Sequence, residues 1–277
     1  MIDLHAHSTA SDGSESPDEV VRLAAAAGLK AIALTDHDTQ AGILQARAQA
    51  AESAIELIPG TELSLEWAQG AMHMVVLFLE PGPGPLQDRL AELREGRSER
   101  NDRIVERLTE LGLPVSHEEI LELGAGDSVG RPHIAAVMVA RGYVATIFDA
   151  FDQYLGWGKP AYMARPRLSP EDGIRLALES NAVPVLAHPH TLGLNNSAQV
   201  TGTLRRLAAA GLIGIECYYQ AYSPFEREGY AALAERFGLK PSGGSDYHGS
   251  YKPDVHLGVG RGNLAVADEL LDALRPA

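Results

Sequence analysis

Short apolar stretches alternate with amphipathic stretches along most of the chain. Apolar runs of strand length end near residues 6, 34, 58, 79, 187, 216 and 242. Helices are expected between them, and three open with a serine–proline pair followed by an acidic residue three positions after the serine, beginning at Ser16, Ser169 and Ser223. Strands that alternate with helices predict right-handed βα units around a parallel sheet or barrel.

Residues 81–165 break this alternation. A Pro–Gly run at 81–85 is followed by a charged helical stretch to residue 111, and shorter helices are expected at 117–123, 131–141 and 146–155. The apolar positions in this region look too sparse for a sizeable core. We therefore expect residues 1–80 and 166–277 to form the barrel, and 81–165 to form a helical insertion that caps one rim of it.

Composition and charge narrow the class of protein. The chain has 277 residues, 45% of them hydrophobic, and a net charge of −14. That charge argues against a long nucleic acid as partner, although bound metal ions can reverse the field locally for a small phosphorylated substrate. The lone Cys217 cannot form an internal disulfide. No apolar run reaches the length of a membrane span, and the first motif leaves no room for a secretory signal, so we expect no membrane contact and a cytoplasmic location.

The first polar motif lies at the start of the chain. In an extended segment His5 and His7 point to the same face, while Leu4 points into the packing. Two neutral imidazoles followed by Asp12 make a chelating arm for a metal ion. The alternative is a strand with two histidines that face solvent.

Further imidazoles and carboxylates follow the other apolar runs. In a βα barrel the carboxyl ends of the strands share one rim, so side chains spread along the sequence meet there. Without cations, so many titratable groups on one rim would repel one another or be desolvated at high cost. The residues at these strand ends are His5, His7, His37, Glu62, His188, Glu216, Asp246 and His248, and His73 lies near the start of the fourth run.

Six motifs together carry a family resemblance. They are HAHSTASDG at 5–13, TDHD at 35–38, GTE at 60–62, HMVVLF at 73–78, AHP at 187–189 and SDYH at 245–248. In this order they resemble the PHP (polymerase and histidinol phosphatase) family over the whole chain. The resemblance implies an α/β fold, a distorted (β/α)7 barrel similar to a TIM barrel, that holds up to three divalent metal ions.

The resemblance also implies which residues bind the metals. All nine positions carry competent ligands. They divide into one set of His5, His7, Glu62 and Asp246, a second of His73 and His188 with Glu62 as the bridge, and a third of Asp12, His37 and His248. Manganese is the metal that the resemblance favours, while mixed imidazole and carboxylate ligands also suit iron or zinc.

The expected reaction follows from the charges of the metal ions and their ligands. Three divalent ions would bring six positive charges against three carboxylates, so an anion-binding pocket would form in an acidic protein. Two ions about 3.5–4 Å apart can share a hydroxide and clamp the oxygens of an in-line displacement. We therefore expect hydrolysis of a phosphomonoester by a metal-bridging hydroxide, without a covalent enzyme intermediate.

Within the family, the insertion and its Gly–Arg–Pro–His segment at 130–133 resemble small phosphoesterases. These act on nucleoside 3′,5′-bisphosphates and on the 5′ ends of short oligoribonucleotides. A histidinol-phosphate phosphatase is the alternative enzyme. A nucleotide sensor that holds metal without turnover is the alternative of another class.

Three further residues are candidates for binding or catalysis. Arg131 is placed as a clamp on the substrate phosphate, because a guanidinium binds phosphate through two hydrogen bonds; the alternative is an arginine on a solvated helix start. His133 is a candidate to contact the same phosphate or to protonate the leaving oxygen, with a structural role as the alternative. His190 is a candidate substrate contact. Asp36 and Asp38 are expected to orient His37 or nearby backbone instead of binding metal.

Overall fold

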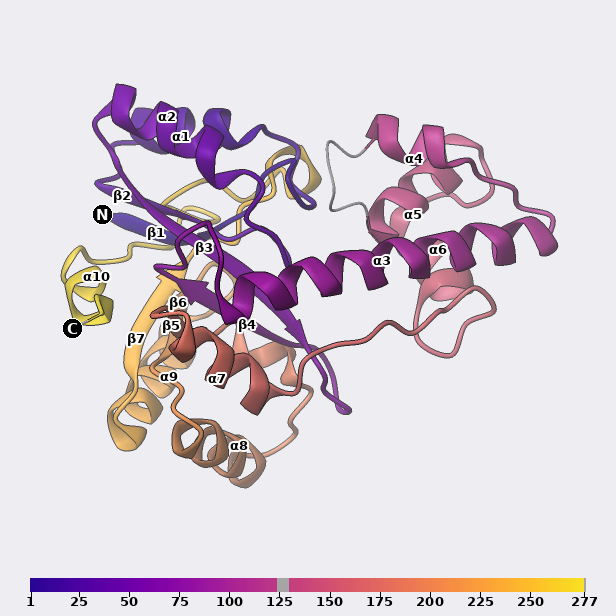
Figure 1. Ribbon diagram of the computed structural model, residues 1–277. Coiled ribbons are helices and arrows are strands. Elements are labelled where there is room, and N and C mark those ends of the chain that lie inside the picture. Colours follow the sequence, from indigo (N-terminus) through magenta and orange to yellow (C-terminus); the bar gives the residue numbers. More distant parts are fainter. Residues whose placement is uncertain (124–129, 277) are drawn as a thin grey trace.

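The structure is a computed structural model that describes residues 1–123 and 130–276, and a seven-stranded sheet forms its centre (Figure 1). The strands pair in sequence order. They are β1 (Ile2–Ala6), β2 (Ala31–Leu34), β3 (Glu56–Leu65), β4 (Met72–Leu77), β5 (Val183–Leu186), β6 (Gly214–Tyr219) and β7 (Lys240–Gly244). The segment after β7 returns to β1, where the Asp246 amide donates to the His5 carbonyl at 2.8 Å. The sheet is thus a nearly closed barrel, as expected.

Helices cover the outside of this barrel, and three of them begin at the predicted serine–proline pairs. Ser169 and Ser223 cap their helices through the side-chain oxygen, whereas the Ser16 side chain makes no capping bond. The outer helices are α1 (Pro17–Ala26), α2 (Ile43–Ser53), α7 (Pro170–Glu179), α8 (Ser197–Ala209) and α9 (Pro224–Phe237). The last helix, α10 (Glu269–Leu274), instead joins the apolar cluster inside the barrel through Leu271 and Leu274.

One strand runs against the predicted direction. β4 pairs antiparallel with both β3 and β5, whereas the other neighbouring strands are parallel. The six residues 66–71 join β3 to β4 without a helix, which is too short a connection for a parallel crossover. The expectation of a uniformly parallel sheet was therefore wrong at β4. Because this strand is reversed, its beginning, with His73 opposite Ser64, lies at the rim where its neighbours end.

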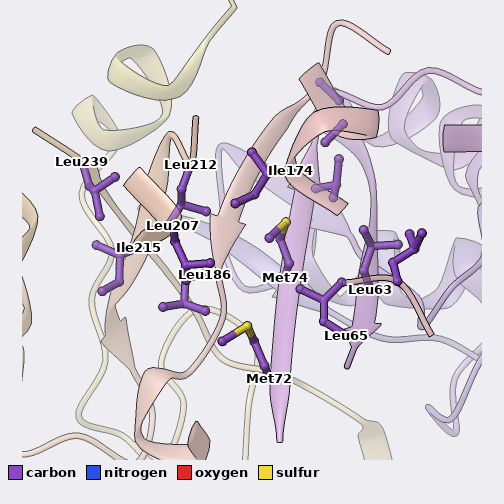
Figure 2. Packing of buried hydrophobic residues seen from close by; sticks show 14 of the residues in the cluster. Leu63, Leu65, Met72, Met74, Ile174, Leu186, Leu207, Leu212, Ile215 and Leu239 are labelled. Atoms are coloured by element: carbon purple, nitrogen blue, oxygen red, sulfur yellow. The ribbon is translucent and has the colours of Figure 1, made fainter. Parts of the chain in front are cut away.

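The two faces of each strand pack into different apolar clusters, because side chains alternate along a strand. Met74 and Val76 of β4 belong to the cluster beneath the outer helices, whereas Val75 and Leu77 point to the opposite face. Figure 2 shows the outer cluster, in which Ile174 of α7 and Leu207 of α8 lie against strand residues such as Leu186. This packing fixes the strands and therefore the positions of their ends.

The insertion is built on one long helix. It comprises α3 (Pro85–Glu110), α4 (His117–Leu123), α5 (Arg131–Ala140), α6 (Ile147–Ala150) and a π-helical turn (Phe151–Leu155). The start of α3 packs on the barrel through Leu86 and Leu90, while its end joins a separate cluster through Ile104 and Leu108 (Figure 1). This second cluster is larger than the sequence led us to expect. The division of the chain at residues 81 and 165 stays a prediction. In the described part of the chain no helix is long and apolar enough to cross a membrane.

Candidate metal centre

The structure brings all nine predicted metal ligands to one end of the barrel. They surround a cavity of about 450 Å³, which we call the central cavity. Its lining includes Asp12, His37, Glu62, His73, His188, Asp246 and His248. His5 and His7 are buried beside it and contact Glu62 and Asp246.

Glu62 lies between two sets of imidazoles. Its Oε1 is 3.1 Å from Nδ1 of His73 and 2.9 Å from Nε2 of His188. Its Oε2 is 3.3 Å from Nε2 of His5 and 3.2 Å from Nε2 of His7. A carboxylate whose two oxygens face different ligand sets has the arrangement needed to bridge two cations.

A third set gathers around Asp12. Its Oδ1 is 3.4 Å from Nε2 of His248, and its Oδ2 is 3.6 Å from Nε2 of His37. Together with His7 these residues form a group whose ligand atoms all lie within 4.8 Å of one another. The groups in the structure use the predicted residues but divide them differently, because His188 groups with His5 and Glu62, whereas His73 groups with His37 and Glu62. The division into three ligand sets stays a prediction.

Buried nitrogen atoms test whether this donor set fits a metal. Nε2 of His5 and Nε2 of His7 are inaccessible to solvent and make no hydrogen bond within the described part of the chain. Buried polar atoms are almost always satisfied, so both nitrogens need a further partner. A divalent cation between them and the carboxylates would supply that partner, and imidazole with carboxylate suits manganese, iron or zinc. The residues therefore fit the metals that the fold implies.

A second carboxylate determines which nitrogens face the centre. Oε1 of Glu216 is 3.1 Å from Nδ1 of His5, and its Oε2 accepts from the His188 backbone amide at 2.6 Å. Nδ1 of His188 in turn lies 3.1 Å from Oγ1 of Thr191. Because these partners engage Nδ1, Nε2 of both imidazoles is left for a cation. The sequence placed Glu216 at the rim but gave it no role.

Asp36 holds the turn that carries the first ligands. It accepts from the amide of Ser8 at 2.8 Å and from the hydroxyls of Ser8 and Ser11 at 2.7 and 2.6 Å. This turn connects His7 to Asp12. Asp36 therefore orients nearby backbone, one of the two roles that the sequence suggested.

Asp38 connects the rim to the insertion. This fully buried carboxylate accepts from the amide of Ser64 at 3.0 Å and pairs with the guanidinium groups of Arg97 and Arg165. Burial raises its pKa, but the two arginines outweigh that effect and hold the pKa well below its usual range. An ionised Asp38 thus joins β3 to α3 and to the segment before α7.

Backbone geometry at two strand ends is unusual. Asp246 has φ 55° and His188 has φ 24°, in the left-handed region that few non-glycine residues adopt. Aspartate and asparagine tolerate this region better than most side chains do. Such backbone tends to occur at functional sites, where the surrounding structure holds it in place.

The protonation states of the ligands differ in how well they suit metal binding. Burial raises the pKa of Glu62, but His37, His5 and His73 outweigh it and hold that pKa well below its usual range. Burial lowers the pKa of His37 to about 4, so its imidazole is neutral at pH 7. Although burial lowers the pKa of His7, Asp246 and Glu62 raise it to about 9. A cation that binds there must displace a proton from His7.

His133 faces the central cavity. Its imidazole is buried, lines the cavity, and accepts a hydrogen bond at Nδ1 from the Gly130 amide at 3.1 Å. Burial lowers its pKa, which favours the neutral form. Because Nδ1 is an acceptor, the neutral ring carries its proton on Nε2.

Arg131 and His190 lie outside the lining of the central cavity. Nη1 of Arg131 donates to the Leu155 carbonyl at 3.0 Å, and its guanidinium lies 5.6 Å from the ring centres of both Phe151 and Tyr162. It lines an adjoining cavity instead. His190 is exposed at the rim, with Nδ1 3.2 Å from the Tyr222 hydroxyl.

Lys252 is a cavity residue that the sequence analysis missed. Its ammonium donates to Oδ2 of Asp246 at 2.6 Å, and the hydroxyl of Tyr219 donates to the same oxygen at 2.8 Å. Both side chains line the central cavity. A lone lysine in a loop carries no motif, so no sequence signal marked it.

Comparisons with known proteins identify the family of the chain. A family model described as the PHP domain matches residues 3–128. The chain is 37% identical to the 5′-3′ exoribonuclease Rnm of Salmonella typhimurium over 254 residues, which cover 90% of this chain and 85% of that protein. It is 33% identical to the 3′,5′-nucleoside bisphosphate phosphatase of Chromobacterium violaceum over 248 residues, or 89% of this chain and 87% of that protein.

A solved structure extends the likeness to the fold. A candidate metal-dependent phosphoesterase from Bifidobacterium adolescentis superposes with a TM-score of 0.85 at 30% identity, covering 99% of this chain and 94% of that one. The predicted barrel and the predicted resemblance are both confirmed. With relatives of this identity over most of its length, and with the ligand motifs gathered at one rim, the chain belongs to the PHP domain family.

Proposed function

We propose that this chain is a metal-dependent phosphoesterase that hydrolyses phosphomonoesters of nucleotides. Nucleoside 3′,5′-bisphosphates are the favoured substrates, with 5′-to-3′ trimming of short oligoribonucleotides as a second activity. The observation that carries the proposal is Glu62, whose two oxygens face different imidazole sets inside the central cavity. The names of the relatives support nucleotide substrates over histidinol phosphate.

The proposed metal ligands are the nine residues predicted from the sequence, for up to three divalent ions with manganese favoured. When bound, such ions supply a hydroxide nucleophile at neutral pH and neutralise the phosphate charge. Asp246 contributes a carboxylate that Tyr219 and Lys252 hold in place. Removal of both donors would leave Oδ2 of that carboxylate without these two hydrogen bonds.

His133 is the proposed proton donor. The neutral ring carries its proton on Nε2 and lines the cavity, so it can donate to the leaving oxygen or to a phosphate oxygen. Arg131 and His190 remain proposed substrate contacts. From their positions they would meet parts of the substrate beyond the phosphate that is hydrolysed.

A substrate panel tests the proposed function. Protein reconstituted with manganese is given adenosine 3′,5′-bisphosphate or histidinol phosphate, and phosphate release is measured. We expect kcat/KM to favour the bisphosphate at least about 10-fold, and Asp246→Asn, which tolerates the left-handed backbone, to reduce kcat at least about 100-fold. Exposed Glu228 of α9 provides the matched control, Glu228→Gln.

Two outcomes would overturn the proposal. A preference for histidinol phosphate would assign the chain to the alternative phosphatase. Tight binding of the bisphosphate to metal-loaded protein without release of phosphate would make it a sensor.

A further inference from the structure

Two adjoining cavities lie between the barrel and the insertion, beside the central cavity. Their volumes are about 640 and 450 Å³, and both are lined by Arg131, Arg167, Trp157 and Tyr162. The larger one shares His73 with the central cavity. We call this region the arginine cleft; it is lined by Arg100, Arg131, Arg165, Arg167, Trp67, Trp157 and Tyr162.

The cleft gathers more positive charge than its described carboxylates balance. Glu66 lines it, and buried Asp38 pairs with Arg165 from below. The hydrogen bond described for the Arg100 guanidinium is to the neutral Asn101 side chain, at 3.1 Å. Nη1 of Arg165 is buried and has no hydrogen-bond partner in the described part of the chain. A guanidinium nitrogen in this state is ready to receive an oxygen acceptor.

The positively charged arginines of the cleft repel one another. Burial, followed by repulsion from Arg131, Arg165, Arg97 and Arg167, lowers the pKa of Arg100 to about 8. A guanidinium nevertheless stays protonated in proteins, so the repulsion persists in the unliganded cleft. An anion bound among these side chains would relieve it.

One exposed aromatic ring completes the cleft. Trp157 is 82% exposed, and its ring meets Tyr162 edge-on at 5.1 Å. A large ring that is left open to solvent beside guanidinium groups is the combination that single-stranded nucleic acid binds, through stacked bases and paired phosphates. The net negative charge of the chain would repel a longer nucleic acid beyond the cleft, so the cleft favours a short segment of nucleic acid.

We propose that the arginine cleft is a second subsite of the enzyme, which binds a phosphate group of the substrate other than the one hydrolysed and stacks a base on Trp157. This inference rests on the proposed function and identifies how the substrate is gripped. The phosphate has two possible sources: the next nucleotide of an oligoribonucleotide, or the 5′-phosphate of the nucleoside whose ester is cleaved.

Three substrates and one substitution test the subsite. Arg167 is half-buried and makes no described hydrogen bond, so Arg167→Gln removes its charge without breaking a described hydrogen bond. Metal-loaded enzyme is assayed with adenosine 3′-phosphate, adenosine 3′,5′-bisphosphate and a 5′-phosphorylated tetraribonucleotide. We expect Arg167→Gln to lower kcat/KM for the tetranucleotide, relative to adenosine 3′-phosphate, about 10-fold. Arg205→Gln, on the exposed face of α8, is the matched control.

A binding signal gives a second readout. Mixing the metal-loaded enzyme with the tetranucleotide in a stopped-flow instrument should quench tryptophan fluorescence rapidly. Trp157→Phe should abolish most of the quench, because the other tryptophan of the chain, Trp67, is half-buried and donates to the Leu192 carbonyl.

The outcomes separate the possibilities. A loss confined to the tetranucleotide supports the subsite and assigns it to the next nucleotide. An equal loss for the bisphosphate supports the subsite and assigns it to the 5′-phosphate. Unchanged relative rates would overturn the subsite, and a quench that persists in Trp157→Phe would overturn the stacking of a base on Trp157, because Trp67 also lines the cleft. If wild-type enzyme hydrolyses none of the three substrates, the proposed function is wrong, and the quench alone decides whether the cleft binds nucleotides.

Discussion

At the scale of single residues, Glu216 acts through the groups it holds. One oxygen engages Nδ1 of His5 and the other accepts from the His188 backbone amide, so one carboxylate positions two ligands from different strands. A carboxylate on the far nitrogen of an imidazole also raises the basicity of the nitrogen that ligates.

Glu216→Gln should weaken metal binding more than it weakens the fold. The amide keeps the size of the side chain but loses the charge that supports His5. We expect manganese affinity, measured by isothermal titration calorimetry, to fall about 10- to 100-fold. Glu228→Gln should leave the affinity unchanged. An unaltered affinity in Glu216→Gln would contradict the positioning role.

Gly244 leaves room for His5. A Cβ at position 244 would overlap Cβ and the backbone nitrogen of His5, because β7 and β1 approach closely there. Gly244→Ala should therefore displace His5 and lower both metal content, measured by elemental analysis, and activity. Gly229 in α9 has open space around it, so Gly229→Ala should change neither. A fully metal-loaded Gly244→Ala protein would contradict this reasoning.

The sequence could place most of the ligands because they lie at the ends of apolar runs, and strand ends meet in a barrel. His73, near the start of its run, was placed by its motif. The sequence could not place Arg131 or Lys252 in the same way. Their positions depend on how the insertion and the last loop turn, and neither has a periodic pattern. Arg131 was expected to clamp the substrate phosphate, and it lines the arginine cleft instead of the central cavity.

At the scale of elements, the reversal of β4 had a signal that the apolar pattern could not give. The apolar run of a buried strand does not indicate whether the strand is parallel or antiparallel to its neighbours. The connection of six residues before it, at 66–71, is the informative feature, because a parallel crossover needs about a dozen or more. Loop length thus decides the direction where hydrophobicity does not.

The ion pairs of Asp38 should hold the insertion to the barrel. Asparagine can adopt the left-handed backbone found at position 38. The Asp38→Asn substitution nevertheless leaves Arg97 and Arg165 buried without their counter-charge. We expect the free energy of unfolding at pH 7, measured with urea, to fall by roughly 3–5 kcal/mol. A loss below about 1 kcal/mol would show that the pairs add little.

The same variant should show a pH signature. The pKa of Asp38 is depressed in the folded protein, so its stabilisation is complete above the unfolded pKa of about 3.9 and is lost as the pH falls towards the folded value. The difference in stability between wild type and Asp38→Asn should therefore be constant from pH 7 to about 5 and shrink below about pH 4.

At the scale of the whole molecule, the protein combines an acidic overall charge with two proposed anion-binding sites. The net charge is −14, yet the proposed metal ions would make the central cavity cationic, and the arginines of the cleft carry positive charge themselves. An anionic substrate is therefore repelled by most of the protein surface and attracted only at these sites. This balance favours short phosphorylated molecules.

Metal removal should lower the stability of the whole fold. Ligands from β1, β3, β4 and the loops after β2, β5 and β7 share the centre, so bound ions tie most strands together. Free manganese at ~1,000 times its dissociation constant should add about 4 kcal/mol per independent site. Calorimetry with manganese or with a chelator should show a higher unfolding temperature for the loaded protein. Equal temperatures would contradict a shared metal centre.

The length of α3 has a consequence for how sequences of this kind can change. The same helix packs on the barrel through Leu86 and carries the insertion through Leu108, so its winding fixes the rotation between them. Adding one residue near its middle would turn the far end by about 100°, and His133 would leave the cavity. Adding seven, close to two full turns, would nearly restore the facing but would move the far end about 10 Å along the helix axis. Insertions and deletions in the middle of this helix should therefore be poorly tolerated, whatever their length.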